Sequence, residues 1–506
     1  MLAGGDVLRS MNFKFRINGE NLSALVIASI FVSAAYAAEP VTGFRENPDG
    51  FGQVLLVPYY TVQKGNATLL NITNADTVNG KAVKVRFRGA GNGDSLMDFS
   101  LFLAPGDVWA AEVSQSPTTG LARLYTPDAS CTLPTQVNVD FAVDRLDTTV
   151  QSYSNETREG YVEILAMADV TPGTPLFMAT QHVKGAPPAP CSNGAQAPTA
   201  LAALGTPEGV AAAGLAPPTT GLMANWSIFN VADAASWSGS ATALQATSAS
   251  GAVGAGLMVL QPQTSNASTL PISGMTSDPL FRAGVVVARS ADFPDLSTPY
   301  LPNMNPLQQV AAISVAMAKR TVTNEFFAED QVQAQTDWVM TFPTRRYEVA
   351  ADKTGGNIYF SNPESEYFSS QNTHPPGHFV NKYCLNSYSR VSRDRKTSKF
   401  VAYDETVPPH FLNEYAKYWM CGAVAVTSIN AGDALEKSSL AASVTRNNDE
   451  FPFSNGWVSI DINNPSGKGI PLVGAVFSKA TSTNIGAGIS GNFGLLWPHR
   501  YTRISP

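Results

Sequence analysis

Apolar and charged side chains alternate most regularly within residues 52–113. Val83, Val85 and Phe87 alternate there with Lys84, Arg86 and Arg88. A period of two residues is typical of a β-strand with one buried face and one face in water. The pattern therefore predicts an apolar buried set and a charged, solvent-facing set on the same strand.

Turn signals flank this strand on both sides. Asn79-Gly80 precedes it and Asn92-Gly93 follows it, and both dipeptides tolerate the positive φ angles of tight hairpins. The next run places Phe99, Leu101 and Leu103 on one face, and Ala104-Pro105-Gly106-Asp107 then turns the chain into residues 108–113. These signals predict an antiparallel β-meander with its own core.

Similar strand-like runs recur along the rest of the chain, with turn signals about every ten residues. This spacing favours a mainly β fold of antiparallel, immunoglobulin-like sandwich domains with long loops and one or two short helices. No repeat of fixed period appears, which disfavours a propeller or a solenoid. We expect an N-terminal β-sandwich domain at 38–190, an Ala/Pro/Gly-rich linker or insertion at 191–221 and a C-terminal β-rich domain at 222–506.

One segment of the C-terminal region has helical spacing instead. Asn305 is a suitable N-cap residue and Pro306 suits the first helical position, and apolar residues then recur every three or four positions. The sequence predicts a helix near 306–319 that packs on a sheet, because its apolar stripe must be covered.

The N-terminus has the features of a secretory signal peptide. Lys14 and Arg16 precede an apolar run at 22–35, and Ala35-Tyr36-Ala37 fits the small-x-small pattern before a cleavage point. We therefore expect residues 1–37 to be removed on export. No later stretch is long and apolar enough for a transmembrane helix, so we expect an exported protein in the periplasm, at the cell surface or outside the cell.

An oxidising compartment would favour disulfides between the four cysteines. No C-x-x-C spacing indicates zinc or thioredoxin-like chemistry. Four cysteines allow three pairings, and we favour the sequence-local one, Cys131 with Cys191 and Cys384 with Cys421.

Several runs together resemble a family of exported, β-rich bacterial cell-surface proteins: residues 52–62, 81–89, 98–109, 158–165, 336–346, the region from Cys384 to Cys421, and 491–503. The resemblance covers most of the chain after residue 37. It implies export and an envelope setting, and it brings no catalytic residue with it.

Composition narrows the class of protein. Hydrophobic residues make up 44% of the chain and charged residues 14%, which argues against intrinsic disorder. The net charge of −7 disfavours a nucleic-acid partner, because phosphate backbones reward clustered Lys and Arg. We predict no cofactor and no catalytic residue, because the chain has no G-x-S-x-G, no P-loop and no dinucleotide fingerprint. We also predict no metal-binding residue. His374 and His378 flank a Pro-Pro-Gly segment that cannot be helical, so their spacing does not place both rings on one helix face.

Two surface hypotheses remain open. The first concerns the dense basic cluster of the chain. This cluster would contact an acidic glycan, a lipid phosphate or a protein, or it would be a solvated hairpin. Its residues are Arg390, Arg393, Arg395, Lys396 and Lys399. The second is a sugar platform built from tryptophans, although their apolar surroundings favour core packing.

The sequence as a whole predicts a non-enzymatic, exported cell-surface or envelope protein with a structural, assembly or adhesion role, acting through self-association or contacts with envelope components. A secreted carbohydrate-binding or carbohydrate-cleaving protein is the first alternative, and clustered tryptophans and carboxylates would support it. An outer-membrane β-barrel is the second, although the chain ends at Ser505-Pro506 without a terminal aromatic residue.

Overall fold

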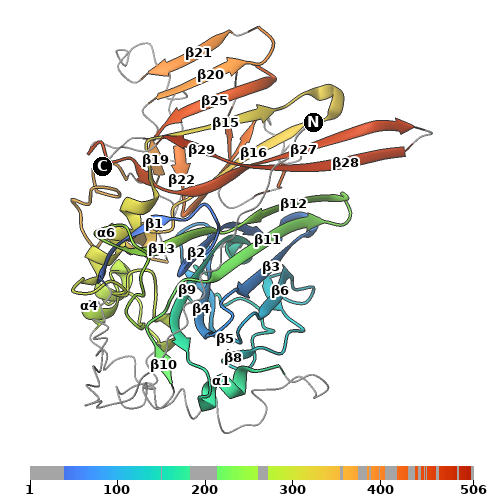
Figure 1. The fold of residues 1–506 in the computed structure, drawn as a ribbon. Coiled ribbons are helices and arrows are strands. Elements are labelled where there is room, and N and C mark those ends of the chain that lie inside the picture. Colours follow the sequence, from blue (N-terminus) through green and yellow to red (C-terminus); the bar gives the residue numbers. More distant parts are fainter. Residues whose placement is uncertain are drawn as a thin grey trace, which may run out of the picture. The chain divides into compact units, whose positions relative to one another are not determined.

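Two antiparallel sheets built largely from the first half of the chain form a β-sandwich in the computed structural model (Figure 1). Sheet 1 has the strand order β1-β13-β2-β9-β4-β5-β8, with β10 paired to β9, and sheet 2 has the order β12-β11-β3-β6-β7. The strands of sheet 1 are β1 (Val41–Glu46), β13 (Thr242–Ser248), β2 (Val54–Thr61), β9 (Glu159–Val170), β4 (Gly80–Gly89), β5 (Ser95–Leu103), β8 (Cys131–Leu133) and β10 (Leu215–Ala216). The strands of sheet 2 are β12 (Ala235–Ser240), β11 (Leu222–Asn230), β3 (Asn66–Asn74), β6 (Val108–Gln115) and β7 (Ala122–Tyr125).

The structure describes residues 39–149, 151–182, 214–259, 272–353, 357–373, 384–386, 389–397, 399–404, 419–430, 439–440, 442, 446–449, 451, 453–462, 466–486 and 489–502. The predicted signal peptide, Cys191 and three of the histidines, His374, His378 and His410, lie outside these ranges. The predictions made for the signal peptide, Cys191, His374 and His378 stay predictions.

The core between sheets 1 and 2 contains the apolar set predicted for β4. Val83, Val85 and Phe87 are fully buried there, together with Trp109 and Trp226 of sheet 2. The period-two pattern thus identified the strand, its register and its core face correctly, and the prediction of a mainly β, antiparallel sandwich is confirmed.

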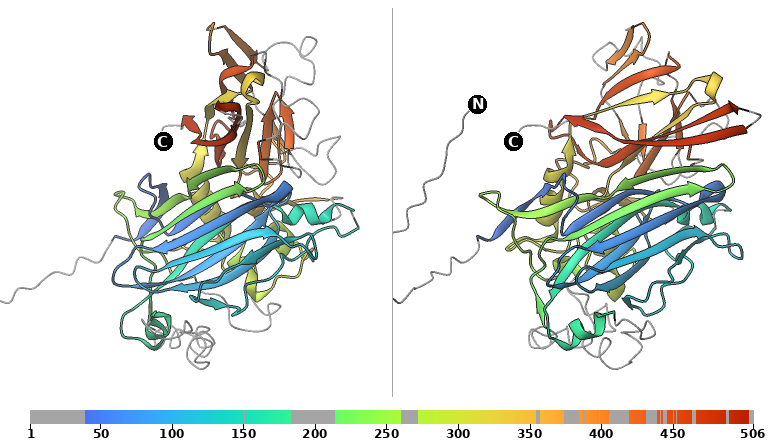
Figure 2. Two further views of the ribbon diagram at one scale, coloured as in Figure 1. Left: turned by 90° about the vertical axis from the view of Figure 1, so that its right-hand side faces the viewer. Right: turned by 45° about the vertical axis from the view of Figure 1, so that its right-hand side comes forward.

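Residues on both sides of the predicted 191–221 linker share this sandwich. Strand β11 pairs with β3, and β13 lies between β1 and β2. Figure 2 shows these green strands among the blue strands from the beginning of the chain. The change of composition at 191–221 therefore does not mark a change of sheet, and the first sandwich extends to Ser248.

A second pair of sheets follows helix α6. Sheet 3 has the order β24-β23-β16-β27-β28 and sheet 4 the order β21-β20-β25-β15-β29. The strands of sheet 3 are β24 (Arg446–Asp449), β23 (Val424–Ile429), β16 (Gln335–Thr341), β27 (Val473–Gly486) and β28 (Ile489–Pro498). The strands of sheet 4 are β21 (Phe400–Asp404), β20 (Ser389–Asp394), β25 (Asn455–Asp461), β15 (Thr321–Phe327) and β29 (Arg500–Thr502).

Sheet 3 is apolar on both of its faces. Trp338 and Met340 of β16 belong to the core shared with sheet 4, whereas Val339 between them belongs to the core of the first sandwich. Successive residues of a strand point to opposite faces. Sheet 3 is therefore a middle layer that packs on sheet 4 on one side and on the first sandwich on the other.

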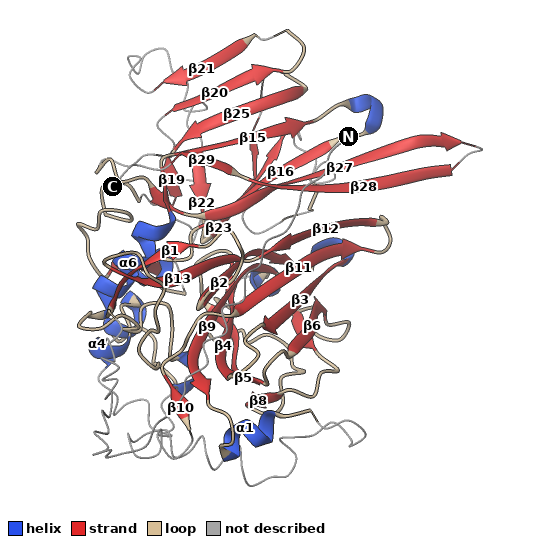
Figure 3. Cartoon of the chain, in the orientation of Figure 1, coloured by secondary structure: helices blue, strands red, loops and turns tan. Residues whose placement is uncertain are grey.

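Helix α6 (Pro306–Met317) confirms the predicted helix near 306–319. Asn305 accepts a hydrogen bond from the backbone of Gln308, and the Gln308 side chain accepts one from the backbone of Asn305, so the cap is a reciprocal capping box. The buried side of the helix packs into the apolar cluster outside sheet 1, next to β1 (Figure 3). The helix ends where Ala318 turns extended and begins β14.

The remaining described elements are short. The α-helices are α1 (Pro175–Thr180), α4 (Ile272–Met275) and α5 (Pro279–Arg282), and the 3₁₀ turns are η1 (Gln63–Gly65), η2 (Tyr153–Thr157), η5 (Ser290–Asp292), η6 (Asp330–Val332) and η7 (Arg345–Tyr347). The two-stranded pairs are β14 (Ala318–Lys319) with β26 (Ile470–Pro471), β17 (Val349–Ala351) with β18 (Ile358–Phe360), and β19 (Cys384–Asn386) with β22 (Trp419–Cys421). Among the helices of the described ranges, none has the length and apolar character needed to cross a bilayer.

The predicted disulfide between Cys384 and Cys421 is present and joins β19 to β22. Cys131 on β8 is buried and disulfide-bonded. Its predicted partner, Cys191, belongs to the part of the chain that the structure does not describe, so that pairing stays a prediction.

Candidate functional site

The charged side chains of β4, predicted to face water, are buried. Lys84, Arg86 and Arg88 are exposed by 2%, 2% and 3%. The Lys84 Nζ donates to the Ala291 carbonyl oxygen at 2.7 Å, and the Arg86 Nη2 donates to the Asp292 carbonyl oxygen at 2.5 Å. The prediction of a wet face was wrong because segments some 200 or more residues further along the chain cover this face of sheet 1: the segment around η5 covers Lys84 and Arg86, and Tyr347 of η7 covers Arg88.

Glu163 of β9 lies at the centre of the buried charges. Its carboxylate accepts hydrogen bonds from the Tyr347 hydroxyl at 2.8 Å and from the Tyr161 hydroxyl at 3.2 Å. Arg88 Nε lies 3.2 Å from the same carboxylate, and the Arg88 guanidinium lies over the Tyr347 ring with its Cζ 5.1 Å from the ring centroid. Burial raises the pKa of both tyrosines well above 10, so both hydroxyls stay protonated and serve as donors.

Two further arginines hold the covering segments in place. Arg346 Nε donates to Asp278 at 2.7 Å, and Arg346 Nη1 donates to Asp94 at 2.7 Å. The two terminal nitrogens of Arg145 donate to the two carboxylate oxygens of Asp292 at 2.6 and 2.7 Å. The pairs of Arg346 with Asp94 and of Arg145 with Asp292 join loops next to sheet 1 to segments beyond residue 270, whereas the pair of Arg346 with Asp278 joins two of those segments to each other.

This buried ionic layer resembles an active site in composition, but its groups are out of reach of solutes. Arg88, Glu163 and Tyr347 are each exposed by 3% or less. A buried charge that loses its partner costs several kcal/mol, whereas a matched pair holds two segments in one register. The arrangement can therefore fix how the covering segments dock on sheet 1, and a substrate cannot contact it in this conformation.

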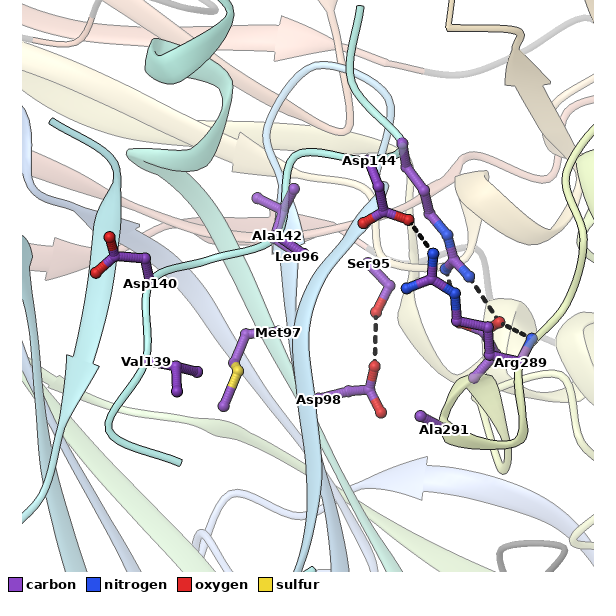
Figure 4. A pocket seen from close by; sticks show the side chains of 12 residues that line it. Ser95, Leu96, Met97, Asp98, Val139, Asp140, Ala142, Asp144, Arg289 and Ala291 are labelled. Atoms are coloured by element: carbon purple, nitrogen blue, oxygen red, sulfur yellow. Dashed lines mark hydrogen bonds and ion pairs between the residues drawn. The ribbon is translucent and has the colours of Figure 1, made fainter. Parts of the chain in front are cut away.

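A pocket of about 200 Å³ opens at the rim of the ionic layer (Figure 4). Its charged lining residues are held in pairs: Asp98 with Lys84, Asp140 with Arg123, Asp292 with Arg145, and the more exposed Asp144 with Arg289. Pairing neutralises these groups, so the pocket offers little net charge to a ligand. No group of three or more potential metal ligands occurs within the described ranges.

The predicted basic cluster is divided between the two faces of the hairpin β20–β21. Arg390 is buried and lies over the ring of Phe451 at 5.2 Å, so its assignment as a surface contact was wrong. Arg393 is partly exposed and lies over the ring of Trp457 at 5.5 Å. The residues of the turn, Arg395, Lys396 and Lys399, are exposed, as expected for a solvated hairpin.

The tryptophans whose burial the structure describes divide into a core class and an exposed class. Trp109, Trp226 and Trp338 are core residues, as their apolar surroundings predicted. Trp457 on β25 and Trp497 on β28 are exposed by 38% and 37%, and for these two the prediction of core packing was wrong. Trp457 stands on the face of sheet 4 that points away from sheet 3, because its neighbour Val458 lies in the shared core.

Strand β28 carries an exposed apolar face that sequence reasoning missed. Phe493, Leu495 and Trp497 are exposed by 52%, 44% and 37%, whereas Leu496, on the opposite face, packs against the core of the first sandwich. In the sequence, residues 491–503 contributed only to the family resemblance. Their apolar residues indicate a strand, but a local pattern could not show which of its two apolar faces meets a partner.

Comparison with known proteins finds no protein family, no curated protein and no solved structure that matches the chain.

Proposed function

We propose that this chain is an exported, non-enzymatic envelope or cell-surface protein that acts by assembly with copies of itself. The observation that carries the proposal is the exposed apolar face of β28, formed by Phe493, Leu495 and Trp497. Contiguous exposed apolar side chains mark interaction sites on soluble proteins. Figure 1 shows β28 and its hairpin partner β27 in red.

The spacing of these residues fits a second copy as the partner. In an antiparallel arrangement centred on Leu495, Phe493 of one copy meets Trp497 of the other, and the two Leu495 side chains meet each other. A two-fold interface requires such self-complementarity, because the same patch serves both partners. Aromatic residues also supply large contact areas at low cost in conformational entropy.

Export is supported by the sequence and by one structural feature. The apolar run at 22–35 followed by Ala35-Tyr36-Ala37 has the pattern of a signal peptide. The disulfide between Cys384 and Cys421 suits an oxidising compartment. An immunoglobulin-like domain type and a bacterial envelope setting belong to the same proposal and rest on the sequence pattern and the resemblance described above.

The proposal is tested by sedimentation of the purified chain over a range of concentrations, together with fractionation of the native host. We expect wild-type protein to associate and Leu495→Arg to remain monomeric, because a charge at the centre of the apolar face cannot be buried without a partner. Val231→Arg is the matched control, since Val231 is 80% exposed and lies outside β28. A wild-type chain that stays monomeric at all concentrations, or that hydrolyses glycans or esters at ordinary enzymatic rates, contradicts the proposal.

A further inference from the structure

The outer face of sheet 4 is an open surface with an aromatic side chain at its centre. The strand register places Trp457 of β25 directly between Glu325 of β15 and Arg393 of β20. The next row along the strands holds Thr323, Ser459 and Val391. All six side chains are at least partly exposed, whereas Val458 and Ile460 of β25 point into the core.

Trp457 contributes little to the core from this position. A tryptophan on the outer face of a sheet exposes apolar area to water, which is unfavourable unless something covers it. The Arg393 guanidinium lies over the indole ring at 5.5 Å, and this cation–π contact restricts the orientation of the ring. The arrangement resembles a preformed platform more than a mobile surface side chain.

The neighbours of Trp457 are suited to hydroxyl groups. The Thr323 hydroxyl donates to the Ser459 hydroxyl at 2.8 Å, so a polar pair that can both donate and accept lies next to the indole. Glu325 and Arg393 add an acceptor and a set of donors on either side. On the four strands of this face whose side chains the structure describes, β15, β20, β25 and β29, the further charged residues are Asp461, one row beyond Ser459, and Arg500, beside Thr323. Two carboxylates therefore balance two guanidinium groups on these four strands.

We propose that this face binds a neutral saccharide, with Trp457 as the stacking platform. A pyranose ring has an apolar face of C–H groups and a rim of hydroxyls, which match an indole surrounded by paired donors and acceptors. The balanced charge of the face gives no advantage to a polyanion. Three rows along the strands and three strands across measure roughly 13 by 10 Å, which suits an oligosaccharide segment of a polymer.

This inference goes beyond the proposed assembly role and uses a different strand and sheet. A saccharide site on sheet 4 would give an envelope protein a ligand, whereas the apolar face of β28 would give it a partner copy. The two exposed tryptophans therefore separate the two proposals: Trp457 belongs to the first site and Trp497 to the second.

Affinity electrophoresis of the purified chain tests the inference, with gels that contain a neutral glucan, xylan or mannan, or the acidic polygalacturonate. We expect at least one neutral polymer to retard the wild-type chain, Trp457→Ala to weaken this retardation at least tenfold, and Tyr125→Ala to leave it unchanged. Tyr125 is the matched control because it is an exposed aromatic residue, at 51%, on β7 and outside both proposed sites.

A second substitution keeps the test decisive if Trp457→Ala does not fold, as judged from near-ultraviolet circular dichroism. Glu325→Ala removes an exposed polar neighbour of Trp457 and should weaken retardation several-fold with an unchanged melting temperature. Absence of retardation by all neutral polymers, retardation by polygalacturonate alone, or equal retardation of wild type and both variants of this face would overturn the inference. None of these outcomes bears on sedimentation of the Leu495→Arg variant, so failure of one proposal is distinguishable from failure of the other.

Discussion

Trp237 Nε1 on β12 donates a hydrogen bond to the carbonyl oxygen of Ser478 on β27 at 2.9 Å. This bond crosses from the edge of sheet 2 to sheet 3. Phe477, next to Ser478, lies among three aromatic rings of the first sandwich, with centroid distances of 6.2 Å to Tyr59, 5.8 Å to Trp226 and 6.4 Å to Trp237. The first sandwich and sheet 3 therefore share one aromatic core.

This shared core predicts that the two halves unfold together. Phe477→Ala removes a fully buried ring and should lower the free energy of unfolding by about 3–5 kcal/mol. Denaturant unfolding followed by tryptophan fluorescence and by far-ultraviolet circular dichroism should show one coincident transition in wild type and variant. Val231→Ala, a truncation at a residue that is 80% exposed, should change the free energy by less than about 1 kcal/mol. Two separate transitions in the wild type would show that the aromatic junction does not couple the halves.

Arg86 provides a test of the buried ionic layer. Arg86→Ser leaves Glu163 and the Asp292 carbonyl oxygen without one of their partners, and such a loss in the interior costs about 3–5 kcal/mol. Thermal and denaturant unfolding of the purified variant should show this loss.

Arg289→Ser is the matched control for Arg86. Arg289 also forms an ion pair, with Asp144, but its side chain is 60% exposed, so its loss should change stability by less than about 0.5 kcal/mol. If Arg86→Ser were as stable as Arg289→Ser, the face of β4 that bears Arg86 would be open to water, as its sequence pattern alone suggests.

The contrast between the two faces of β4 shows what the sequence could predict. The alternation of Val83, Val85 and Phe87 with charged residues identified the strand and its core face, because both depend only on local periodicity. Whether Lys84 and Arg86 meet water depends on the segment around Asp292, which approaches from far along the chain. No local pattern contains that information, and charged residues are rarely fully buried unless they are paired.

Local patterns also could not predict the two exposed surfaces, the outer face of sheet 4 around Trp457 and the apolar face of β28. The start of α6 could be predicted because an N-cap Asn followed by Pro is a local signal, whereas the reciprocal bond with Gln308 was not predicted. Trp457 and Trp338 both sit in apolar, alternating runs, yet one is exposed and the other lies between two sheets. Strand pairing decides this difference: β16 lies in the middle of sheet 3, where both faces of the sheet are covered, whereas the outer face of β25 is open.

Glu348 should make the protein less stable as the pH rises from acid to neutral. It is buried, and burial raises the pKa of its carboxyl from 4.5 to about 7, although the Ser365 hydroxyl donates a hydrogen bond to it. The folded chain therefore keeps the Glu348 proton to a higher pH than the unfolded chain does. The contribution of Glu348 is fully present below pH 4.5 and is lost as the pH rises through about 7, a change of about 3 kcal/mol.

Denaturant unfolding of wild type and Glu348→Gln at pH 5 and pH 8 measures this effect. The amide cannot ionise, so the variant should become more stable relative to wild type as the pH rises from 5 to 8. Glu364→Gln is the control, because Glu364 is exposed in the same loop region. Parallel pH profiles of wild type and Glu348→Gln would show that the Glu348 carboxyl ionises freely in the folded protein.

His499 should have the opposite dependence on pH. Its Nδ1 lies 3.3 Å from the Asn324 Nδ2, which can only donate, and its Nε2 lies 3.1 Å from the Val339 carbonyl oxygen, which can only accept. These partners fix a neutral imidazole with its proton on Nε2. Burial lowers the pKa of His499 from 6.5 to about 3, although the bond to Val339 favours the charged form.

As the pH falls, the unfolded chain therefore binds a proton at His499 at a higher pH than the folded chain does. Its contribution to stability is fully present above pH 6.5 and is lost as the pH falls toward 3, a change of up to about 5 kcal/mol. His499→Gln keeps a donor and an acceptor but cannot ionise, so the stability difference between wild type and variant should shrink steadily from pH 7 to pH 4. His182→Gln, at an exposed imidazole paired with Asp107, controls for general acid effects. If the variant and wild type lost stability in parallel over this range, the neutral state assigned to His499 would be refuted, since protonation of that ring would then carry no cost.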